Sequence, residues 1–233
     1  MNWNRVEQRL RPGLRMASCG LLLLILPCSL RAGQVIDRIV ATVNGHIILQ
    51  SDWDEDVRYE AFINSRALDH ISTEDRKAAL DRLIDQELLR EQAQAAKAWH
   101  PSEGEISKAL QQMRQQLPHS GTDRLWQAAL NSYALTEADL KRRVVIQLEL
   151  MRLIDTRIRP AVHVDSTSVE SYYSEEFLPQ LRRTGAKTVP LSMVSARVQD
   201  LLTQKLINER LISWIQQLRA ASNIRTDFKG HGE

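Results

Sequence analysis

The stretch Ile39–Asp56, IVATVNGHIILQSDWDED, decides how the fold begins. An Asn-Gly dipeptide joins the apolar runs Val35–Val43 and His46–Gln50, and it is the strongest short signal for a β-hairpin, because both turn residues must adopt positive φ. The acids that follow Ser51 indicate a helix that Ser51 caps and whose dipole the negative charges stabilise. A two-stranded hairpin is barely stable alone. The sequence therefore predicts a third strand or a helix layer from elsewhere in the chain.

Residues 1–32 have the pattern of a secretory signal peptide. An arginine-rich segment with one acid precedes the uncharged run MASCGLLLLILPCSL at 16–30, and Arg-Ala-Gly follows. This order of charged, apolar and small residues is typical of signal peptides, and the apolar run is shorter than the roughly 20 residues of a membrane span. We predict cleavage after Ala32. An uncleaved anchor is the alternative, because Leu30 is unusual three residues before a cleavage site.

The composition changes once residues 1–32 are set aside. The chain has a formal net charge of +2, but this segment holds five arginines and one glutamate, so the remaining chain is slightly acidic. That charge argues against nucleic-acid binding, which requires a basic patch. Both cysteines also lie in the segment, so the exported chain is predicted to have neither a thiol nucleophile nor a disulfide. About 200 residues can bury a large core without crosslinks.

Apolar residues recur at helical spacing along most of the remaining chain. Capping spacings at Ser102 and Thr136 mark two helix starts, while Asn223–Phe228 alternates apolar and polar residues like a strand. The chain is therefore predicted to be mainly α, with a helical core and a small antiparallel sheet formed by the N-terminal hairpin and the C-terminal strand. The predicted helices lie at 73–99, 102–113, 121–130, 136–160, 166–177 and 192–221, with a Pro- and Gly-containing connector at 178–191.

The sequence offers no convincing catalytic or metal-binding pattern. The six histidines, at 46, 70, 100, 119, 163 and 231, include no i, i+4 pair with the Glu of a zinc hydrolase. His163 and Asp165 could form an acid–base pair, but a loop before a helix cap is the favoured interpretation. The four acids between 52 and 56 lack the later Gly and Glu of a calcium loop. We therefore predict no catalytic residue, no cofactor and no metal.

Large apolar side chains allow two interpretations. Tryptophans could form flat platforms for unfolded chains, although burial in a core is their commoner role. Methionines could provide a pliable binding surface, but three of them are ordinary in a helical core. The residues concerned are Trp53, Trp99, Trp126, Trp214, Met113, Met151 and Met193. From sequence alone, the residues that would contact a bound polypeptide are unknown.

The order of elements and several motifs resemble SurA-type periplasmic chaperones. The segments that carry the resemblance are VIDRIVATVNGHIILQSDWDED (35–56), ALDRLIDQELLREQAQAAKAW (79–99), PSEGEISKALQQM (101–113), LTEADLKRRVVIQLELMRLIDTRI (135–158), VHVDSTSVESYY (162–173) and VQDLLTQKLINERLISWIQQLRAASNIRTDF (198–228). The resemblance covers nearly all of residues 35–228 and implies a mainly helical chaperone module whose two ends share one core.

This resemblance divides the chain into four parts. They are a signal peptide at 1–32, a SurA-like N-terminal chaperone region at 33–177, the connector at 178–191, and a closing helix and strand of the same core at 192–233. SurA-like proteins usually carry one or two parvulin-type prolyl isomerase domains before the closing helix. The connector is far shorter than such a domain of about 100 residues, so we expect no isomerase activity.

The function implied by the resemblance is that of an ATP-independent periplasmic chaperone. Its partners would be unfolded outer-membrane or secreted polypeptides, which it would keep from aggregating. Nucleic acid is not an expected partner, and neither is stable membrane insertion after signal cleavage. A non-catalytic envelope scaffold with one fixed partner is the alternative, and a peptidyl-prolyl isomerase is the least favoured reading.

Overall fold

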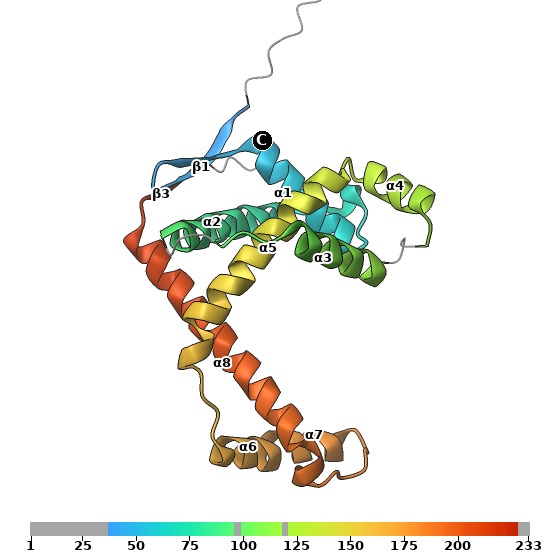
Figure 1. Ribbon diagram of the computed structural model, residues 1–233, viewed down its shortest axis with the longest axis vertical. Coiled ribbons are helices and arrows are strands. Elements are labelled where there is room, and N and C mark those ends of the chain that lie inside the picture. Colours follow the sequence, from blue (N-terminus) through green and yellow to red (C-terminus); the bar gives the residue numbers. More distant parts are fainter. Residues whose placement is uncertain (1–36, 96–98, 118–120, 228–233) are drawn as a thin grey trace, which may run out of the picture. The chain divides into compact units, whose positions relative to one another are not determined.

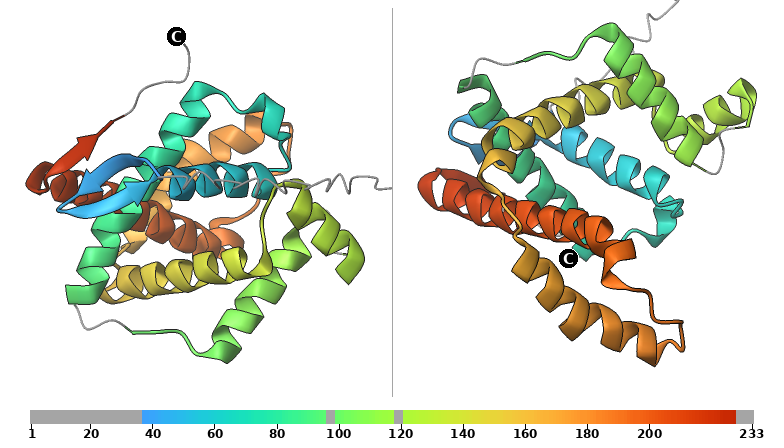
Figure 2. Two further views of the ribbon diagram at one scale, coloured as in Figure 1. Left: turned by 90° about the horizontal axis from the view of Figure 1, so that it is seen from above. Right: turned by 60° about the horizontal axis from the view of Figure 1, so that its bottom comes forward.

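The hairpin and a strand from the far end of the chain form one small sheet. The computed structural model describes residues 37–95, 99–117 and 121–227 (Figure 1), so the predicted signal peptide lies outside the described residues. Strands β1 (Ile39–Val43) and β2 (His46–Leu49) are antiparallel, and β3 (Ile224–Thr226) pairs with the other side of β1. The strand order is β2-β1-β3. Figure 2 shows β3 beside the hairpin, which confirms the predicted sheet.

Helices make up most of the rest of the described chain, which confirms the mainly α prediction. Short 3-10 turns lie at Leu68–His70 and Arg159–Ala161, and a π-helical turn lies at Tyr173–Phe177. The α-helices are α1 (Gln50–Ile63), α2 (Thr73–Ala95), α3 (Glu103–Gln116), α4 (Asp123–Ser132), α5 (Glu137–Arg157), α6 (Ser166–Tyr172), α7 (Leu178–Arg183) and α8 (Leu191–Ala221).

The hairpin turn holds the two ends of the described chain together. Asn44 and Gly45 have φ of 51° and 93°, as the Asn-Gly signal predicted. The Asn44 amide nitrogen donates to Ser222 Oγ at 3.2 Å and to Glu91 Oε2 at 2.7 Å. Its carbonyl oxygen accepts from the Asn223 backbone N–H at 2.9 Å. One turn residue therefore connects the sheet to α2 and to the junction between α8 and β3.

The start of helix α1 differs from the prediction. The helix begins at Gln50, one residue before the predicted cap, and the Asp52 carboxylate accepts from the Leu49 backbone N–H at 3.0 Å. Ser51 is therefore not the N-cap. Both its backbone N–H and its hydroxyl donate to the Asp37 carboxylate instead. An acid three residues after the cap satisfies the backbone N–H of the cap residue here, whereas the sequence suggested a serine.

The capping boxes of α3 and α5 form as predicted. The Glu105 backbone N–H donates to Ser102 Oγ, and the Glu105 carboxylate accepts from the Ser102 backbone N–H at 2.8 Å. Thr136 and Asp139 make the same reciprocal exchange, with the Asp139 carboxylate 2.7 Å from the Thr136 N–H. Each exchange satisfies two otherwise unpaired donors at a helix end.

The connector predicted at residues 178–191 is partly helical. Helix α6 runs through the π-helical turn into α7, and the chain leaves helical geometry only at Gly185, where φ is 68°. Pro179 lies just after the wide turn. A proline has no N–H and clashes with the carbonyl four residues earlier, and a π-helical turn gives that carbonyl room. The Pro and Gly that suggested a loop therefore mark a distorted turn and a helix end.

Apolar side chains gather in three clusters. The hairpin cluster joins β1, β2, α1 and α2, and Leu218 of α8 and Ile224 of β3 pack against it. The aromatic cluster joins α1, α4 and α5 around Phe62, whose ring meets Trp126 and Tyr133 edge to face. The valine cluster, built from Val164, Val169 and Val198, joins α6 to the N-terminal half of α8.

Helix α8 packs on α2 near its C-terminal end. Arg219 donates from Nε to Asp85 at 2.5 Å and from Nη2 to the Asp81 carbonyl oxygen at 2.9 Å. Leu218 adds apolar contact with the hairpin cluster, which contains Leu83 at its edge and Leu88 at its centre. The closing helix and strand thus belong to the same core as the hairpin.

Candidate functional site

A groove of about 430 Å³ lies between β2, α1, α2 and α5. Four elements that are distant in sequence form it, because the hairpin cluster places β2 over α1 and α2 while α5 packs on α2. The lining residues are His46, Ile47, Ile48, Asp52, Glu55, Leu83, Gln86, Glu87, Arg90, Arg142, Arg143 and Ile146. The groove therefore combines apolar side chains with a rim of charges of both signs.

The apolar part of the groove reaches from the core to the surface. Ile48 is buried in the hairpin cluster, and Leu83 packs against that cluster. Ile47 lies at the mouth, where 46% of the residue is exposed. An entering apolar side chain would meet aliphatic surface here, at about 25 cal/mol of stabilisation per Å² removed from water.

The edge of the sheet borders this groove. Strand β2 is an outer strand of the described sheet. In a two-residue hairpin the pair that flanks the turn, here Val43 and His46, is hydrogen-bonded, and the next pair is not. The N–H and C=O of Ile47, which faces Thr42 in that next pair, therefore point away from β1. They can pair with an added extended segment.

Glu87 forms the α2 side of the groove. It is only 6% exposed, although it is an acid. Arg90 donates to it from Nε at 2.6 Å and from Nη2 at 2.5 Å, and His46 Nδ1 lies 3.6 Å from Glu87 Oε1. The hydrogen bond to Glu87 is the main reason why the pKa of Arg90 is raised. The bidentate pairing makes this buried acid tolerable.

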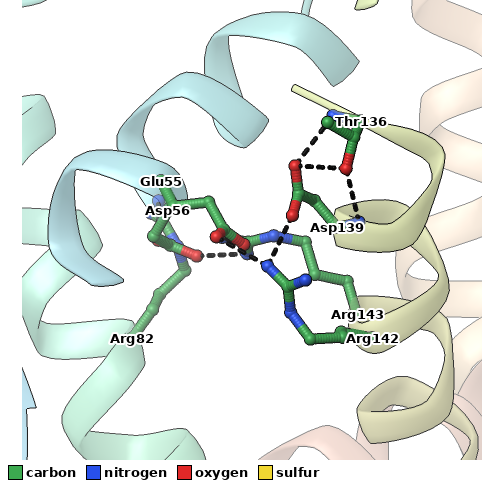
Figure 3. A network of polar contacts seen from close by, with 7 residues as sticks. All are labelled: Glu55, Asp56, Arg82, Thr136, Asp139, Arg142 and Arg143. Carbon is green, nitrogen blue, oxygen red and sulfur yellow. Dashed lines mark hydrogen bonds and ion pairs between the residues drawn. The ribbon is translucent and has the colours of Figure 1, made fainter. Parts of the chain in front are cut away.

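Asp56 is the centre of a second buried ion pair (Figure 3). It is 4% exposed and accepts from Arg143 Nη1 of α5 at 2.6 Å and from Arg82 Nη2 of α2 at 3.2 Å. Arg143 also lies over the ring of Tyr59, 4.3 Å from its centre, and its Nε is buried without a partner among the described residues. Burial raises the pKa of Tyr59 although Arg143 acts against it. One acid thereby joins three helices.

Glu55 and Arg142 form the exposed part of the same network. Arg142 Nη2 lies 2.9 Å from Glu55 and 2.5 Å from Asp139, the residue that also caps α5 (Figure 3). Burial alone would raise the pKa of Asp139, but hydrogen bonds from Thr136 and Arg142 outweigh it and lower that pKa. The charges around the groove thus satisfy one another. The arrangement suits binding of a mainly uncharged segment.

The tryptophans divide between the two interpretations. Trp53 and Trp126 are buried in the hairpin and aromatic clusters, so they are core residues and no platforms. Trp99 and Trp214 are more accessible, and each lies under an arginine: Arg152 for Trp99 and Arg157 for Trp214. None of the four lines the groove.

The methionines divide in the same way. Met113 packs against the aromatic cluster. Met151 on α5 is exposed, and Met193 on α8 is 76% exposed. Helical spacing identified the side on which they lie but could not tell which part of that side another element covers.

The acids that could have suggested calcium form the first turns of α1, as expected. Asp52 caps the helix, Asp54 pairs with Arg76 at 2.8 Å, and Glu55 and Asp56 pair with arginines of α5. Asp165 likewise caps α6, with the Ser168 backbone N–H at 2.7 Å. That hydrogen bond is the main cause of its lowered pKa. The interpretation of Asp165 as a helix cap is confirmed.

The remaining histidines do not converge with other metal ligands. His100 Nδ1 lies 2.7 Å from Glu149 on the surface, whereas positions 119 and 231 lie outside the described residues. Within the described ranges, no three His, Cys, Asp or Glu side chains come together in a way that could hold a metal ion. None of the helices in those ranges carries an apolar run of the length and purity that a membrane span needs.

Sequence reasoning missed the groove and its buried acids. A usable signal existed: Asp56 lies between Trp53 and Val57, and Glu87 lies between Ile84 and Leu88, so each acid falls on the apolar side of its helix. A charge on such a side requires a partner. The sequence could not tell which arginine supplies it, since Asp56 and Arg143 are 87 residues apart.

Comparison with known protein families gives a match over more than half of the chain. Residues 21–154 match the family described as the SurA-like N-terminal domain. The matched range contains the sheet's hairpin and helices α1 to α4 with nearly all of α5. It therefore includes every residue that lines the groove. A search of curated proteins gave no match.

Proposed function

Because the chain belongs to the SurA-like N-terminal domain family, we propose that it is a periplasmic chaperone that binds unfolded outer-membrane or secreted polypeptides without nucleotide. The observation that carries the proposal is the groove beside the β2 edge, which offers apolar surface and free backbone groups together. Unfolded polypeptides have the matching features, which are exposed apolar side chains and unpaired backbone amides.

The mechanism follows from this pairing. An extended segment adds to the edge at Ile47 through backbone hydrogen bonds, which depend little on sequence. Alternate side chains of the segment then point into the groove toward Ile48 and Leu83. Each apolar side chain that is buried contributes about 1.5–3 kcal/mol, and ordering of the segment offsets much of this gain. Binding is therefore weak, reversible and broad, and it shields the segment from other unfolded chains.

The charged rim adds selectivity against charged segments. Glu87 and Glu55 already have arginine partners at hydrogen-bond distance. A charged side chain that entered would have to compete with these pairs and lose its own hydration. The groove therefore favours apolar and neutral stretches, which are the parts of an unfolded membrane or secreted protein that aggregate.

We also propose that the chain is exported and that it does not act as a prolyl isomerase. We expect the leader to be cleaved after Ala32 on the way to the periplasm, so N-terminal sequencing of the protein from the envelope should start at Gly33. We also expect no prolyl isomerisation, because residues 158–190 between α5 and α8 form only short helical turns and helices. The rate of cis–trans exchange in a proline test peptide should be unchanged by the pure protein.

The test measures aggregation of a denatured outer-membrane barrel protein by light scattering. The wild-type protein should slow aggregation without ATP. Ile47→Glu places a charge at the groove mouth and should weaken this activity several-fold, whereas Leu125→Glu, an equally drastic change at an exposed apolar residue of α4, should not. Ile47→Pro removes the outward N–H along with the isoleucine side chain and should weaken it too, while Ile47→Val, which keeps the N–H and a branched side chain, should not. Thermal unfolding of each variant checks the fold.

Two outcomes would contradict the proposal. If the wild-type protein neither slows aggregation nor binds unfolded chains, a scaffold role with one fixed partner replaces it. If it slows aggregation but the Ile47 and Leu125 variants behave alike, the activity does not depend on the groove.

A further inference from the structure

A second pocket, the α5–α8 pocket, is lined by residues from the end of α5, the turn that follows it and the C-terminal half of α8. Its volume is about 270 Å³, which is smaller than the usual pocket for a drug-sized ligand. Its lining residues are Arg157, Ile158, Ala161, Arg210, Ser213, Trp214 and Gln217. It shares no residue with the groove beside β2.

Charge distinguishes this pocket from the groove. Arg157 and Arg210 both line it, and no acid does. Elsewhere arginines such as Arg143 and Arg219 have carboxylates within hydrogen-bond distance. Arg157 instead lies over the Trp214 ring, 4.7 Å from its centre, and among the described residues neither Arg157 nor Arg210 has an ion-pair partner. The guanidinium groups of Arg157 and Arg210 thus line the α5–α8 pocket, and no acid is among its lining residues.

The other lining groups define what kind of anion fits. Gln217 donates from Nε2 to Ser213 Oγ at 3.4 Å, which leaves the Ser213 hydroxyl hydrogen free to donate to a ligand. Ile158 and Ala161 add an apolar wall opposite the polar groups of α8. A guanidinium binds a carboxylate through two parallel hydrogen bonds. The pocket therefore suits a carboxylate that is attached to a small apolar body, about the size of one amino-acid residue.

We propose that the α5–α8 pocket binds a carboxylate of a polypeptide client, as a second contact separate from the groove. This inference rests on the proposed function for the identity of the ligand as a polypeptide. The carboxylate has two possible sources, the C-terminus of the client and an Asp or Glu side chain. A carboxylate contact would complement the groove, because the groove favours neutral segments and this pocket favours a negative one.

The binding test uses a fluorescent apolar peptide made in four forms. Two forms differ in a C-terminal acid or amide, and two amidated forms differ in an internal Glu or Gln. The free-acid or the Glu form should bind the wild-type protein about tenfold more tightly than its neutral counterpart, the size of one charge-assisted hydrogen bond. Which pair shows the difference identifies the source. The double variant Arg157→Gln with Arg210→Gln should abolish it.

A matched control separates local from general charge effects. Arg124→Gln with Arg197→Gln removes the same net charge at two exposed positions outside the pocket, and it should keep the tenfold preference. The double variant Arg157→Lys with Arg210→Lys keeps the charge but loses the planar fork, and it should retain only part of the preference. Equal affinity of the wild-type protein for the charged and neutral forms of both pairs would overturn the proposal.

A small probe makes the test independent of chaperone activity. N-acetyl-leucine, but not its amide, should shift the indole ¹H–¹⁵N NMR signal that Trp214→Phe removes. If the acid shifts this signal but no unfolded client is held, the pocket is supported and the proposed function fails. If clients are held while acid and amide act alike on the signal, the pocket proposal fails and the proposed function stands.

Discussion

The hairpin cluster and the valine cluster both involve side chains of helix α8, but they differ in how completely their residues are buried. In the hairpin cluster, Val40, Val43, Ile84 and Leu88 are almost completely buried. The valine cluster contains three buried valines, and around it Met193 and Leu201 of α8 are exposed. Helix α8 contributes to both, so its C-terminal end is held by a dense core and its N-terminal end by a sparse one.

One helix can therefore have a different local stability at each end. Buried apolar contacts and buried ion pairs set the free energy of local opening. Asp56 and Arg143 supply such a pair close to the hairpin cluster, whereas no salt bridge joins two described residues within 162–207. The segment from α6 to the first turns of α8 should therefore open while the sheet and α2 stay folded. The following predictions test that contrast.

Substitution of Asp56 should cause the greatest loss in the free energy of unfolding. Asp56→Ala leaves the largely buried Arg143 without its nearest anion, and losing one partner of a buried pair costs about 3–5 kcal/mol. Urea unfolding followed by circular dichroism should give this loss in the free energy of unfolding. Asp200→Ala on the exposed surface of α8 is the control and should cost almost nothing. A loss below about 1 kcal/mol at Asp56 would mean that the pair does not join the three helices.

A pair of leucine substitutions compares the two clusters directly. Leu88→Ala should lower the free energy of unfolding by about 3 kcal/mol, because Leu88 is 1% exposed and leaves a cavity. Leu202→Ala in α8, which is only partly buried against the valine cluster, should cost about 1 kcal/mol. Equal losses in urea unfolding would refute the contrast between a dense and a sparse core.

Removing β3 should lower the free energy of unfolding by an intermediate amount. Truncation after Ala221 eliminates the pairing of β3 with β1 and the packing of Ile224, and we expect a loss of about 2 kcal/mol. Truncation after Phe228 keeps the described strand and is the control. The melting temperature should fall for the first truncation alone. An unchanged value would show that β3 adds nothing to the hairpin cluster.

We expect the smallest change in stability at Asp139, and this change depends on pH. The lowered pKa of Asp139 means that its contribution to stability is complete at pH values above the ordinary carboxyl range near 3.8 and is lost as the pH falls through the lower value in the folded state. Asp139→Asn should therefore be less stable than the wild type at pH 7 and approach it near pH 2. Parallel stability curves over that range would argue against the network of Thr136, Arg142 and Asp139.

Local features of the sequence predicted local structure well. The Asn-Gly turn, the boxes at Ser102 and Thr136, and the strand near residue 224 all depend on the chemistry of a few adjacent residues. The pairing of β3 with β1 could also be inferred, since the hairpin needed a partner and one strand remained. Each of these follows from satisfying backbone groups.

Side-chain contacts between distant residues could not be predicted. Leu201 and Ile212 are large apolar residues of α8, yet both are exposed, because α6 and α2 cover only parts of that long helix. The groove required four elements in contact, and its ion pairs join residues up to 88 positions apart. The spacing of apolar and charged residues indicates which side chains need a partner. Only the three-dimensional structure identifies that partner.

The bond between Asn44 and Ser222 spans 178 positions, and this separation constrains the order of folding. The hairpin can form within microseconds, but closure of so long a loop carries an entropic cost that only later contacts repay. The free side of β1 should consequently stay open until the last helix has emerged. In a pulse-labelling hydrogen-exchange experiment, the Asn223 amide should become protected after those of Val43 and His46. Simultaneous protection would show that the sheet closes in one step.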